Sequence, residues 1–388
     1  MVKIKIKKEE EEEEEGGKFI DHFTINIPKA EFDIYHTLRP GQSFTWKELR
    51  HDAFRGVIAG NLVTLEYAGE TLTCTVLGRA AGAEPLSAQD VRRYLRLDVS
   101  LVRLDEAWRR AGTGLGAQYL ESVSVLPAAP GVRLLRQDPV ETLFSFICSQ
   151  NNNVKRIFGI VQRLRAAYGT PIATIDGEAW HDFPTLDALA AAPPDALKEK
   201  VGLGYRAPYI AKSARMCLEK GGRAWLEGLA EKGVSRADAR KELLALSGVG
   251  PKVADCVCIY GLEKLDVAPV DVHVFSIAKR AGVCGKKCAS LSPAIIEKIG
   301  DAFRETFGEY AGWAQAVMFT AEIEAATTST EKVSSNNDKL KEPKFKKIKK
   351  EEEGKEEEKD DDEEEEWEEE EKDDKKEKKK KKVTKNRI

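Results

Sequence analysis

The sequence predicts an α+β fold that is mainly helical, with an N-terminal antiparallel β-sheet subdomain and disordered charged tails. Residues 62–67 and 71–76 alternate with a period of two on either side of a short turn, which is typical of a β-hairpin. From Asp138 onward, apolar residues recur instead at helical spacing. Both chain ends are dominated by Glu and Lys and lack the apolar residues needed to form a core.

Composition divides the chain into four segments. They are a disordered acidic tail at 1–18, a mixed α/β subdomain at 19–130, a helical region at 131–326 and a disordered charged tail at 327–388. The net charge is −4, of which the tails hold −2 and −3, so the middle of the chain carries +1. A nearly neutral middle argues against nonspecific coating of DNA, although a local basic face remains compatible with it.

The seven cysteines are scattered and odd in number, which indicates free thiols in a reducing compartment. The C-x2-C spacing of structural zinc sites is missing. No stretch is long and apolar enough to span a membrane. The first 18 residues are too acidic for a mitochondrial transit peptide.

The N-terminal subdomain contains a turn at 40–46 that feeds an apolar strand, and a turn glycine is the simplest interpretation of Gly41. The helical region opens at Asp138, a predicted N-cap followed by Pro139 at the first helical position. Glu141 stands at the third position, as in a capping box. Behind it runs an apolar stripe that we expect in the core: Leu143, Phe144, Ile147 and Cys148.

Two polar or glycine-rich segments interrupt the helical region. Residues 149–153, which include Asn151, read as a polar loop after a helix, and Arg156 just beyond reads as a surface charge. Residues 201–206, which end in Tyr205 and Arg206, read as a glycine-rich turn.

The most informative stretch runs from 243 to 273. A helix at 237–246 is followed by a tight turn at 247–250, because Gly248 and Gly250 tolerate positive φ. Pro251 starts a second helix that ends near Gly261. This pattern predicts a helix-hairpin-helix whose glycine turn presents amides at a helix N-terminus, an arrangement that suits a phosphate.

Lys252 stands in the first turn of that second helix, where the helix dipole disfavours its ammonium form. A lysine so placed, above all in an apolar site, is a candidate amine nucleophile that forms Schiff bases. Cys256 lies four residues on and shares its helix face. Asp271 is predicted as the N-cap of a third helix at 272–281.

The pattern L-x-G-V-G-x-K, followed by V-D-V-H at this spacing, resembles the helix-hairpin-helix DNA glycosylases. The resemblance is closest to the eukaryotic 8-oxoguanine DNA glycosylase/lyases and covers roughly residues 19–325. Ser247 departs from the proline often found there, which affects only the stiffness of the turn. The resemblance implies a bifunctional enzyme in which Lys252 attacks C1′ of the deoxyribose while Asp271 stays ionised, activates Lys252 and stabilises the developing charge.

Further motifs resemble the same family and imply roles in recognition. The segment P-G-Q-S-F-x-W implies that the Gly41 carbonyl accepts a hydrogen bond from N7–H of the oxidised guanine. The segment W-A-Q-A-V-x-F implies that Gln315 hydrogen-bonds to the Watson–Crick edge of the flipped base and that Phe319 stacks on its ring. We place Cys256 in the same pocket. The remaining roles are on the DNA: Asn151 fills the gap, Tyr205 wedges the stack, Arg156 and Arg206 hold the abandoned cytosine, and Gly248, Gly250 and His273 contact phosphates.

The resemblance also implies a cation at the hairpin, held by the main-chain carbonyls of Leu244, Leu246 and Val249 and by a DNA phosphate. No cofactor is otherwise expected, and the four-cysteine loop of the iron–sulfur glycosylases is missing. The expected partner is duplex DNA that contains oxidised guanine, and we expect a monomer with no membrane association. The lysine run at 378–382 is compatible with a nuclear localisation signal and almost equally with a solubilising tail. We expect the nucleus, with the mitochondrion as an alternative compartment.

Two rival functions remain open from the sequence. One is a monofunctional glycosylase for another lesion, such as an alkylated purine, which Lys252 argues against because hydrolysis needs no amine. The other is a noncatalytic module that holds DNA through the helix-hairpin-helix. The combination of Lys252, Asp271, Gln315 and Phe319 argues against that module.

Overall fold

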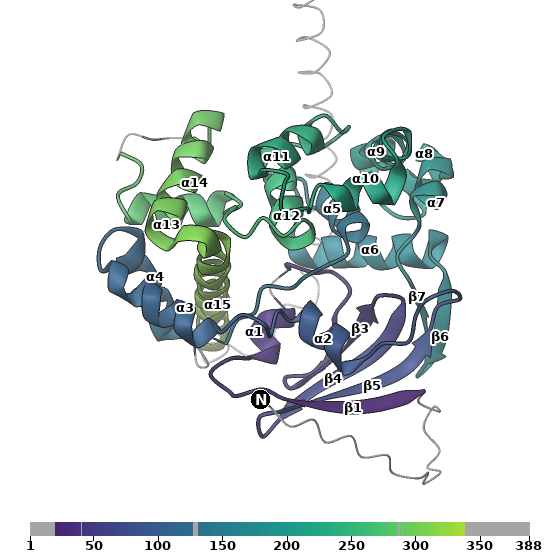
Figure 1. The fold of residues 1–388 in the computed structure, drawn as a ribbon, viewed down its shortest axis with the longest axis horizontal. Helices are drawn as coiled ribbons and strands as arrows, with labels where there is room; N and C mark the ends of the chain where they lie inside the picture. The colour runs from purple at the N-terminus through teal and green to yellow at the C-terminus, as the bar shows by residue number, and fades with distance from the viewer. Residues whose placement is uncertain (1–19, 40, 127–130, 286–287, 289, 338–388) are drawn as a thin grey trace, which may run out of the picture. The chain divides into compact units, whose positions relative to one another are not determined.

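A five-stranded antiparallel sheet of order β1-β5-β4-β3-β2 occupies the N-terminal part of the chain (Figure 1). The structure, a computed structural model, describes residues 20–39, 41–126, 131–285, 288 and 290–337. The strands are β1 (Asp21–Asn26), β2 (Lys47–Arg50), β3 (Ala53–Ile58), β4 (Asn61–Ala68) and β5 (Thr71–Arg79).

The predicted hairpin is confirmed as β4 and β5, which pair in antiparallel register with Leu65 opposite Cys74. Along β5, buried and half-buried residues alternate, as the period of two requires. The expectation of an apolar strand after the 40–46 turn was wrong. Phe44 and Trp46 are buried in an irregular segment, and β2, which follows, is exposed along its length because it is an edge strand with polar side chains.

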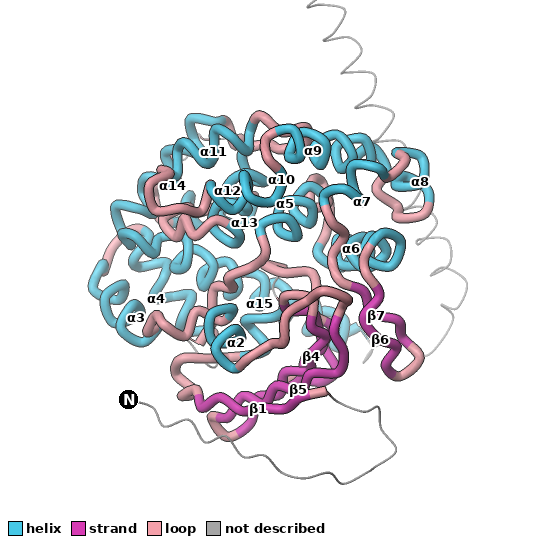
Figure 2. The backbone as a smooth tube through the Cα atoms, turned by 45° about the vertical axis from the view of Figure 1, so that its right-hand side comes forward, coloured by secondary structure: helices cyan, strands magenta, loops and turns pink. Residues whose placement is uncertain are grey.

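Helices make up most of the remaining described chain (Figure 2). They are α1 (Ile34–Leu38), α2 (Ala88–Tyr94), α3 (Leu101–Trp108), α4 (Leu115–Val125), α5 (Pro139–Ile147), α6 (Val154–Tyr168), α7 (Leu186–Ala191), α8 (Pro194–Glu199), α9 (Ala207–Glu219), α10 (Gly222–Gly228), α11 (Arg236–Leu244), α12 (Pro251–Gly261), α13 (Val272–Arg280), α14 (Pro293–Phe307) and α15 (Ala311–Asn337). A second antiparallel hairpin that the sequence did not reveal, β6 (Pro171–Ile175) with β7 (Glu178–His181), interrupts them.

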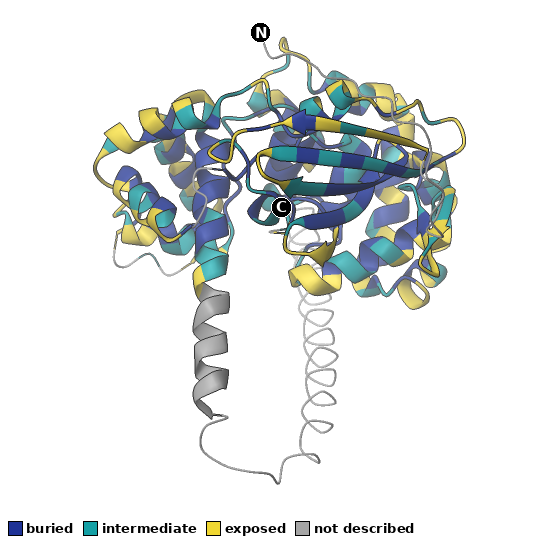
Figure 3. Cartoon of the chain, turned by 90° about the horizontal axis from the view of Figure 1, so that it is seen from below, coloured by how far each residue is buried: buried dark blue, intermediate teal, exposed yellow. Residues whose placement is uncertain are grey.

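Two main hydrophobic cores form, and buried residues follow the inner faces of sheet and helices (Figure 3). The smaller core lies on the sheet and includes Phe32, Leu65 and Leu135. The larger core unites the helices, including α3 and α4 through Leu101 and Tyr119. The predicted core stripe on α5 is confirmed, because all four of its side chains are fully buried.

One expectation about the start of α5 needs correction. Asp138 caps α5 by accepting from Glu141 N at 2.9 Å, but the capping box is incomplete. The Glu141 carboxylate pairs with the buried Arg165 instead, a stronger charge-assisted partner than a backbone amide.

Helix α15 runs to Asn337, past the boundary at Thr327 that composition predicts for the C-terminal tail. The rest of the predicted tails lies outside the described residues.

The seven cysteines are free thiols, as predicted. No helix among the described residues is both long and apolar enough to cross a membrane.

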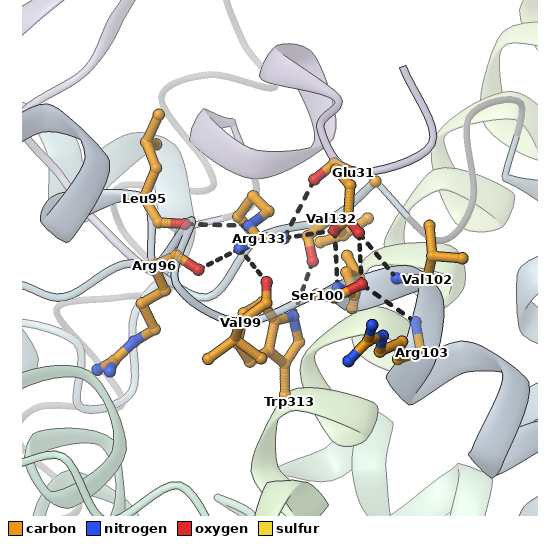
Figure 4. A network of polar contacts seen from close by, with 12 residues as sticks. Glu31, Leu95, Arg96, Val99, Ser100, Val102, Arg103, Val132, Arg133 and Trp313 are labelled. Carbon is orange, nitrogen blue, oxygen red and sulfur yellow. Dashed lines mark hydrogen bonds and ion pairs between the residues drawn. The ribbon is translucent and has the colours of Figure 1, made fainter. Parts of the chain in front are cut away.

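The buried Arg133 guanidinium joins the N-terminal elements to α15 (Figure 4). Its Nη1 donates to the Glu31 carboxylate at 3.0 Å, and further donors reach the carbonyls of the turn that follows α2. The guanidinium carbon lies 5.0 Å from the ring centroid of Trp313 on α15, and Trp313 Nε1 donates to Val132 O at 2.9 Å. Glu31 also accepts from Leu101 N at the start of α3.

Removal of the Glu31 carboxylate should therefore be costly. Burial lowers the pKa of Arg133 to about 10, although the negative charge of Glu31 raises that pKa. We expect Glu31→Ala to lower the free energy of unfolding by about 3 kcal/mol, because it leaves a buried charge unpaired. Glu66→Ala, which breaks the exposed pair with Arg50, is the matched control and should cost less than ~1 kcal/mol. Urea denaturation measures both, and equal losses would contradict the buried role.

Candidate active site

The predicted helix-hairpin-helix is confirmed as α11, a turn at 245–250 and α12. Gly248 has φ +72°, and a Cβ built there would lie 2.5 Å from Tyr209 Cγ, so the turn needs glycine for both conformation and space. Arg240 on α11 pairs with the buried Asp255 on α12 at 2.7 Å. The two helices are thereby locked into one unit behind the turn.

The first turn of α12 lacks a side-chain cap, because its N-cap is Gly250. Most other helices of eight residues or more in the described chain begin with a side chain that accepts from the first turn, as Ser235 does for α11. The amides at the start of α12 are consequently available to an external anion. Lys252 lies half-buried in this turn.

The prediction of Asp271 as an N-cap is confirmed. Its Oδ1 accepts from the backbone N–H groups of His273 and Val274, each at 3.0 Å. The carboxylate therefore stands at the positive end of α13, where a helix dipole favours negative charge.

Lys252, Cys256 and Asp271 lie near one another, since the charges of Lys252 and Asp271 both act on the Cys256 thiol. Cys256 is 3 % exposed, and burial raises the pKa of its thiol to about 12. The Lys252 charge opposes this increase and the Asp271 charge adds to it, so both lie within electrostatic reach of the sulfur. The site therefore pairs one amine and one carboxylate beside a thiol that stays protonated at neutral pH.

Helix α15 supplies the opposite side of this site. Phe319 packs edge-on against His273, with 5.8 Å between ring centroids. Gln315 is 4 % exposed, and its Oε1 is buried without a hydrogen-bond partner among the described residues. Gly312 permits the approach, because a Cβ there would lie 2.3 Å from Ile259 Cδ1 on α12. A buried acceptor with no partner is costly in a folded protein, and this one lies on the helix that contacts His273 through Phe319.

Gly41 has φ +79° and is tied to α12 through two glutamines that sequence analysis missed. Gln42 donates from Nε2 to Thr37 O and Arg133 O, at 2.8 and 2.9 Å. Gln137 donates from Nε2 to Gln42 O at 2.6 Å, and its own N–H donates to Tyr260 O at 2.9 Å. Both glutamines lie beside recognised motifs, but their partners are backbone carbonyls distant in sequence, which no local pattern reveals.

A cavity of about 470 Å³ lies near Gly41, which is not itself part of the wall. Its walls come from α1, the segment before β2, the start of α6 and α15. Val154 lines it and lies 3.2 Å from a Cβ built on Gly41. The cavity reaches α15 at Thr320 and Ile323, beyond Phe319, and Lys252 is not part of its wall.

The two interrupting loops meet each other. Asn151 is exposed, and its backbone adopts the left-handed conformation with φ +41°. Arg206 is buried and donates from Nε to Gln150 O and from Nη2 to Asn151 O, both at 2.9 Å. Tyr205 is 38 % exposed, and Arg156 is exposed in the first turn of α6. In the structure Arg206 therefore anchors the loop that carries Asn151, so contact with a cytosine would require it to exchange partners.

Three main-chain carbonyls of the hairpin accept hydrogen bonds from protein donors. Ser247 O accepts from Ser213 Oγ at 2.5 Å, and Gly248 O accepts from Gln150 Nε2 at 2.8 Å. Among the three carbonyls expected to bind a cation, Leu246 O accepts weakly from Val249 N at 3.4 Å. No cluster of three or more His, Cys, Asp or Glu side chains that could hold a metal occurs in the described ranges.

Comparison with known proteins points to DNA base excision. Residues 24–143 match the 8-oxoguanine DNA glycosylase N-terminal domain, and residues 144–300 match the HhH-GPD superfamily of base excision DNA repair proteins. The chain is 33 % identical to N-glycosylase/DNA lyase OGG1 of Arabidopsis thaliana, over 82 % of this chain and 85 % of that protein. It is 34 % identical to N-glycosylase/DNA lyase of Saccharomyces cerevisiae, over 78 % and 87 %.

Solved structures agree with these matches. MBOgg1 in complex with a low affinity DNA ligand aligns with a TM-score of 0.66 at 27 % identity, over 81 % of this chain and 98 % of that one. The Clostridium acetobutylicum 8-oxoguanine glycosylase/lyase, bound to duplex DNA with cytosine opposite 8-oxoG, aligns with a TM-score of 0.63 at 25 % identity, over 76 % and 93 %.

The hairpin geometry predicts unequal effects at its two glycines. Gly248→Ala places a methyl group against the Tyr209 ring at positive φ, and we expect it to lower the free energy of unfolding by ~1–3 kcal/mol. Gly250→Ala is the matched control, because Gly250 has φ −90° and open space around its Cβ position. It should cost less than ~1 kcal/mol. Thermal or urea unfolding measures both, and a tolerated Gly248→Ala would contradict the close approach.

Proposed function

Because the chain belongs to the OGG1-type N-glycosylase/DNA lyases of base excision repair, we propose that Lys252 and Asp271 carry out its reaction. The enzyme removes 8-oxoguanine opposite cytosine from duplex DNA and cleaves the strand at the resulting abasic site. The observation that carries the assignment of residues is the meeting of an amine, a carboxylate and a buried thiol at the start of α12.

Lys252 acts as the nucleophile. Its Nζ, as the free amine, attacks C1′ of the extruded nucleotide, and the C1′–N9 bond breaks as the base takes the bonding electrons and then a proton. The resulting amine opens the sugar to a Schiff base, which acidifies the C2′ proton. Loss of that proton expels the 3′ phosphate by β-elimination, and hydrolysis of the Schiff base restores the lysine.

Asp271 supplies the negative charge that these reaction steps need. The two amides at Oδ1 fix the carboxylate, so that it orients Lys252 and stabilises the positive charge that develops at C1′. Fixed polar groups act without reorganisation when the charge appears.

The flipped base is recognised by groups from three elements. Gln315 Oε1 accepts from the N–H groups on the Watson–Crick edge of guanine, which supplies the partner that this buried atom lacks. Phe319 and the neutral Cys256 cover the faces of the ring. The Gly41 carbonyl accepts from N7–H, a proton that 8-oxoguanine carries and guanine does not.

The DNA is held on both sides of the lesion. The uncapped amides near Gly248 and Gly250, together with His273, bind phosphates. Asn151 fills the gap in the duplex and Tyr205 wedges the stack.

Arg156 and Arg206 donate to O2 and N3 of the unpaired cytosine. Adenine presents a donor at this edge, so lesions opposite cytosine should be preferred. Equal excision opposite all four bases would contradict these arginine roles.

The finer properties follow from the same site. The carbonyls of Leu244, Leu246 and Val249 would hold a cation that bridges the hairpin to a DNA phosphate, and such an ion would neutralise phosphate charge. The enzyme acts as a monomer without another cofactor. It works in the nucleus, to which the lysine run at 378–382 directs it, and the mitochondrion is the alternative.

Borohydride trapping tests the nucleophile and separates this enzyme from a hydrolytic glycosylase. Wild-type protein with a duplex that contains 8-oxoguanine opposite cytosine should give a covalent adduct. Lys252→Gln should lose excision and trapping at least ~100-fold while it still binds the duplex, because amide nitrogen cannot replace the amine. Lys264→Gln, which removes a lysine bonded to carbonyls away from the site, is the control for trapping at other amines. Wild-type trapping by Lys252→Gln would refute the assignment.

Asp271→Asn separates the cap of α13 from the chemistry. Asparagine still accepts from His273 N and Val274 N, so the melting temperature should remain near the wild-type value. Single-turnover excision should fall at least ~100-fold, because the charge beside Lys252 is gone. A variant that excises at the wild-type rate would leave Asp271 with a structural role alone.

A further inference from the structure

We infer that Gln150 is a positioning residue that holds the DNA-inserting loop at a fixed distance from the hairpin that carries Lys252. This inference rests on the proposed function, because it concerns how that same site is assembled. Gln150 lies in the polar segment 149–153, but the family resemblance gave it no role. It lies between the end of α5 and Asn151, and it is half-buried.

The side chain of Gln150 joins two elements. Its Nε2 donates to Ile147 O at the end of α5, at 3.0 Å, and to Gly248 O in the hairpin, at 2.8 Å. A primary amide has two N–H donors, and this geometry uses both of them. The amide thus bridges a helix end to the turn that precedes Lys252.

The backbone of Gln150 joins the third element. Its carbonyl accepts from Arg206 Nε at 2.9 Å, and Arg206 Nη2 continues to Asn151 O at 2.9 Å. The Arg206 guanidinium also lies over the Tyr205 ring, 4.3 Å from its centroid. One residue therefore holds the segments that carry Asn151 and Tyr205 against the hairpin.

A second contact makes this bridge a determinant of geometry rather than one bond among many. Tyr209 packs closely against the hairpin at Gly248 and edge-on against Tyr205, with 6.3 Å between the ring centroids. Gln150 bonds to the carbonyl of the same glycine, so the ring and the hydrogen bond locate one point of the turn together. This point sets how far Lys252 stands from the sugar once the loop has entered the duplex, and an error of about 1 Å at a reacting pair costs roughly 100-fold.

Gln150→Ala tests the bridge, with Ser149→Ala as the matched control. Ser149 makes a comparable bond, from Oγ to Phe146 O at 2.8 Å, but this bond stays within the end of α5. We expect Gln150→Ala to slow single-turnover excision about tenfold, equivalent to ~1.4 kcal/mol. Its melting temperature and its affinity for the lesion duplex should match the wild type, and Ser149→Ala should excise within about twofold of it.

Hydrogen exchange supplies a readout that needs no activity. Amides of the 245–252 segment should exchange faster in Gln150→Ala, while those of α9 should not change. Gln150→Glu keeps the shape but turns both donors into acceptors, so it should show the same two effects if the alanine variant fails to fold. Wild-type excision and wild-type exchange in a folded variant would overturn the inference. Inactive wild-type protein would instead refute the proposed function, while the exchange result would still judge the bridge.

Discussion

The buried guanidinium of Arg133 is the constraint on which the site depends, because it fixes the N-terminal sheet region to α15. Arg133 is 1 % exposed, and a charge so placed must be fully bonded or it destabilises the fold. The Glu31 carboxylate, four backbone carbonyls and the face of Trp313 satisfy it. Trp313 stands two residues before Gln315 on the same helix. The ring that packs on Arg133 therefore also sets the position of the residue proposed to read the flipped base.

From this anchor the walls of the site are tied together by polar bonds to backbone rather than by side-chain packing alone. The Gln42 side chain donates to Arg133 O, and the Gln137 side chain donates to Gln42 O. The backbone N–H of Gln137 donates to Tyr260 O on α12. The loop of Gly41 is in this way coupled to the helix that presents Lys252. Bonds of this type contribute modestly to stability but fix direction and distance, which an active site needs more than stability.

The sequence predicted what depends on local pattern, and the structure added what depends on distant partners. Turn glycines, the Asp271 cap and the period-two hairpin are decided within a few residues, so they could be read correctly. The prediction that Glu141 completes a capping box was wrong, because a buried arginine 24 residues away competes for its carboxylate. The role of Gln150 was invisible for the same reason, since its partner in the hairpin lies 98 residues away. Arg206 was recognised as a motif residue, yet its attachment to the Asn151 loop could come only from coordinates.

The half-buried state of Lys252 has a consequence for control of the proposed reaction. Lys252 is half-buried, so water still reaches its side chain in the free enzyme. Asp271 and the protonated Cys256 are already fixed beside it, so the site lacks only the removal of that water. In the proposed mechanism, the extruded nucleotide itself covers the lysine and excludes solvent. In that mechanism, exclusion of water from Lys252 coincides with insertion of the base, so the site is completed only when a nucleotide has left the stack.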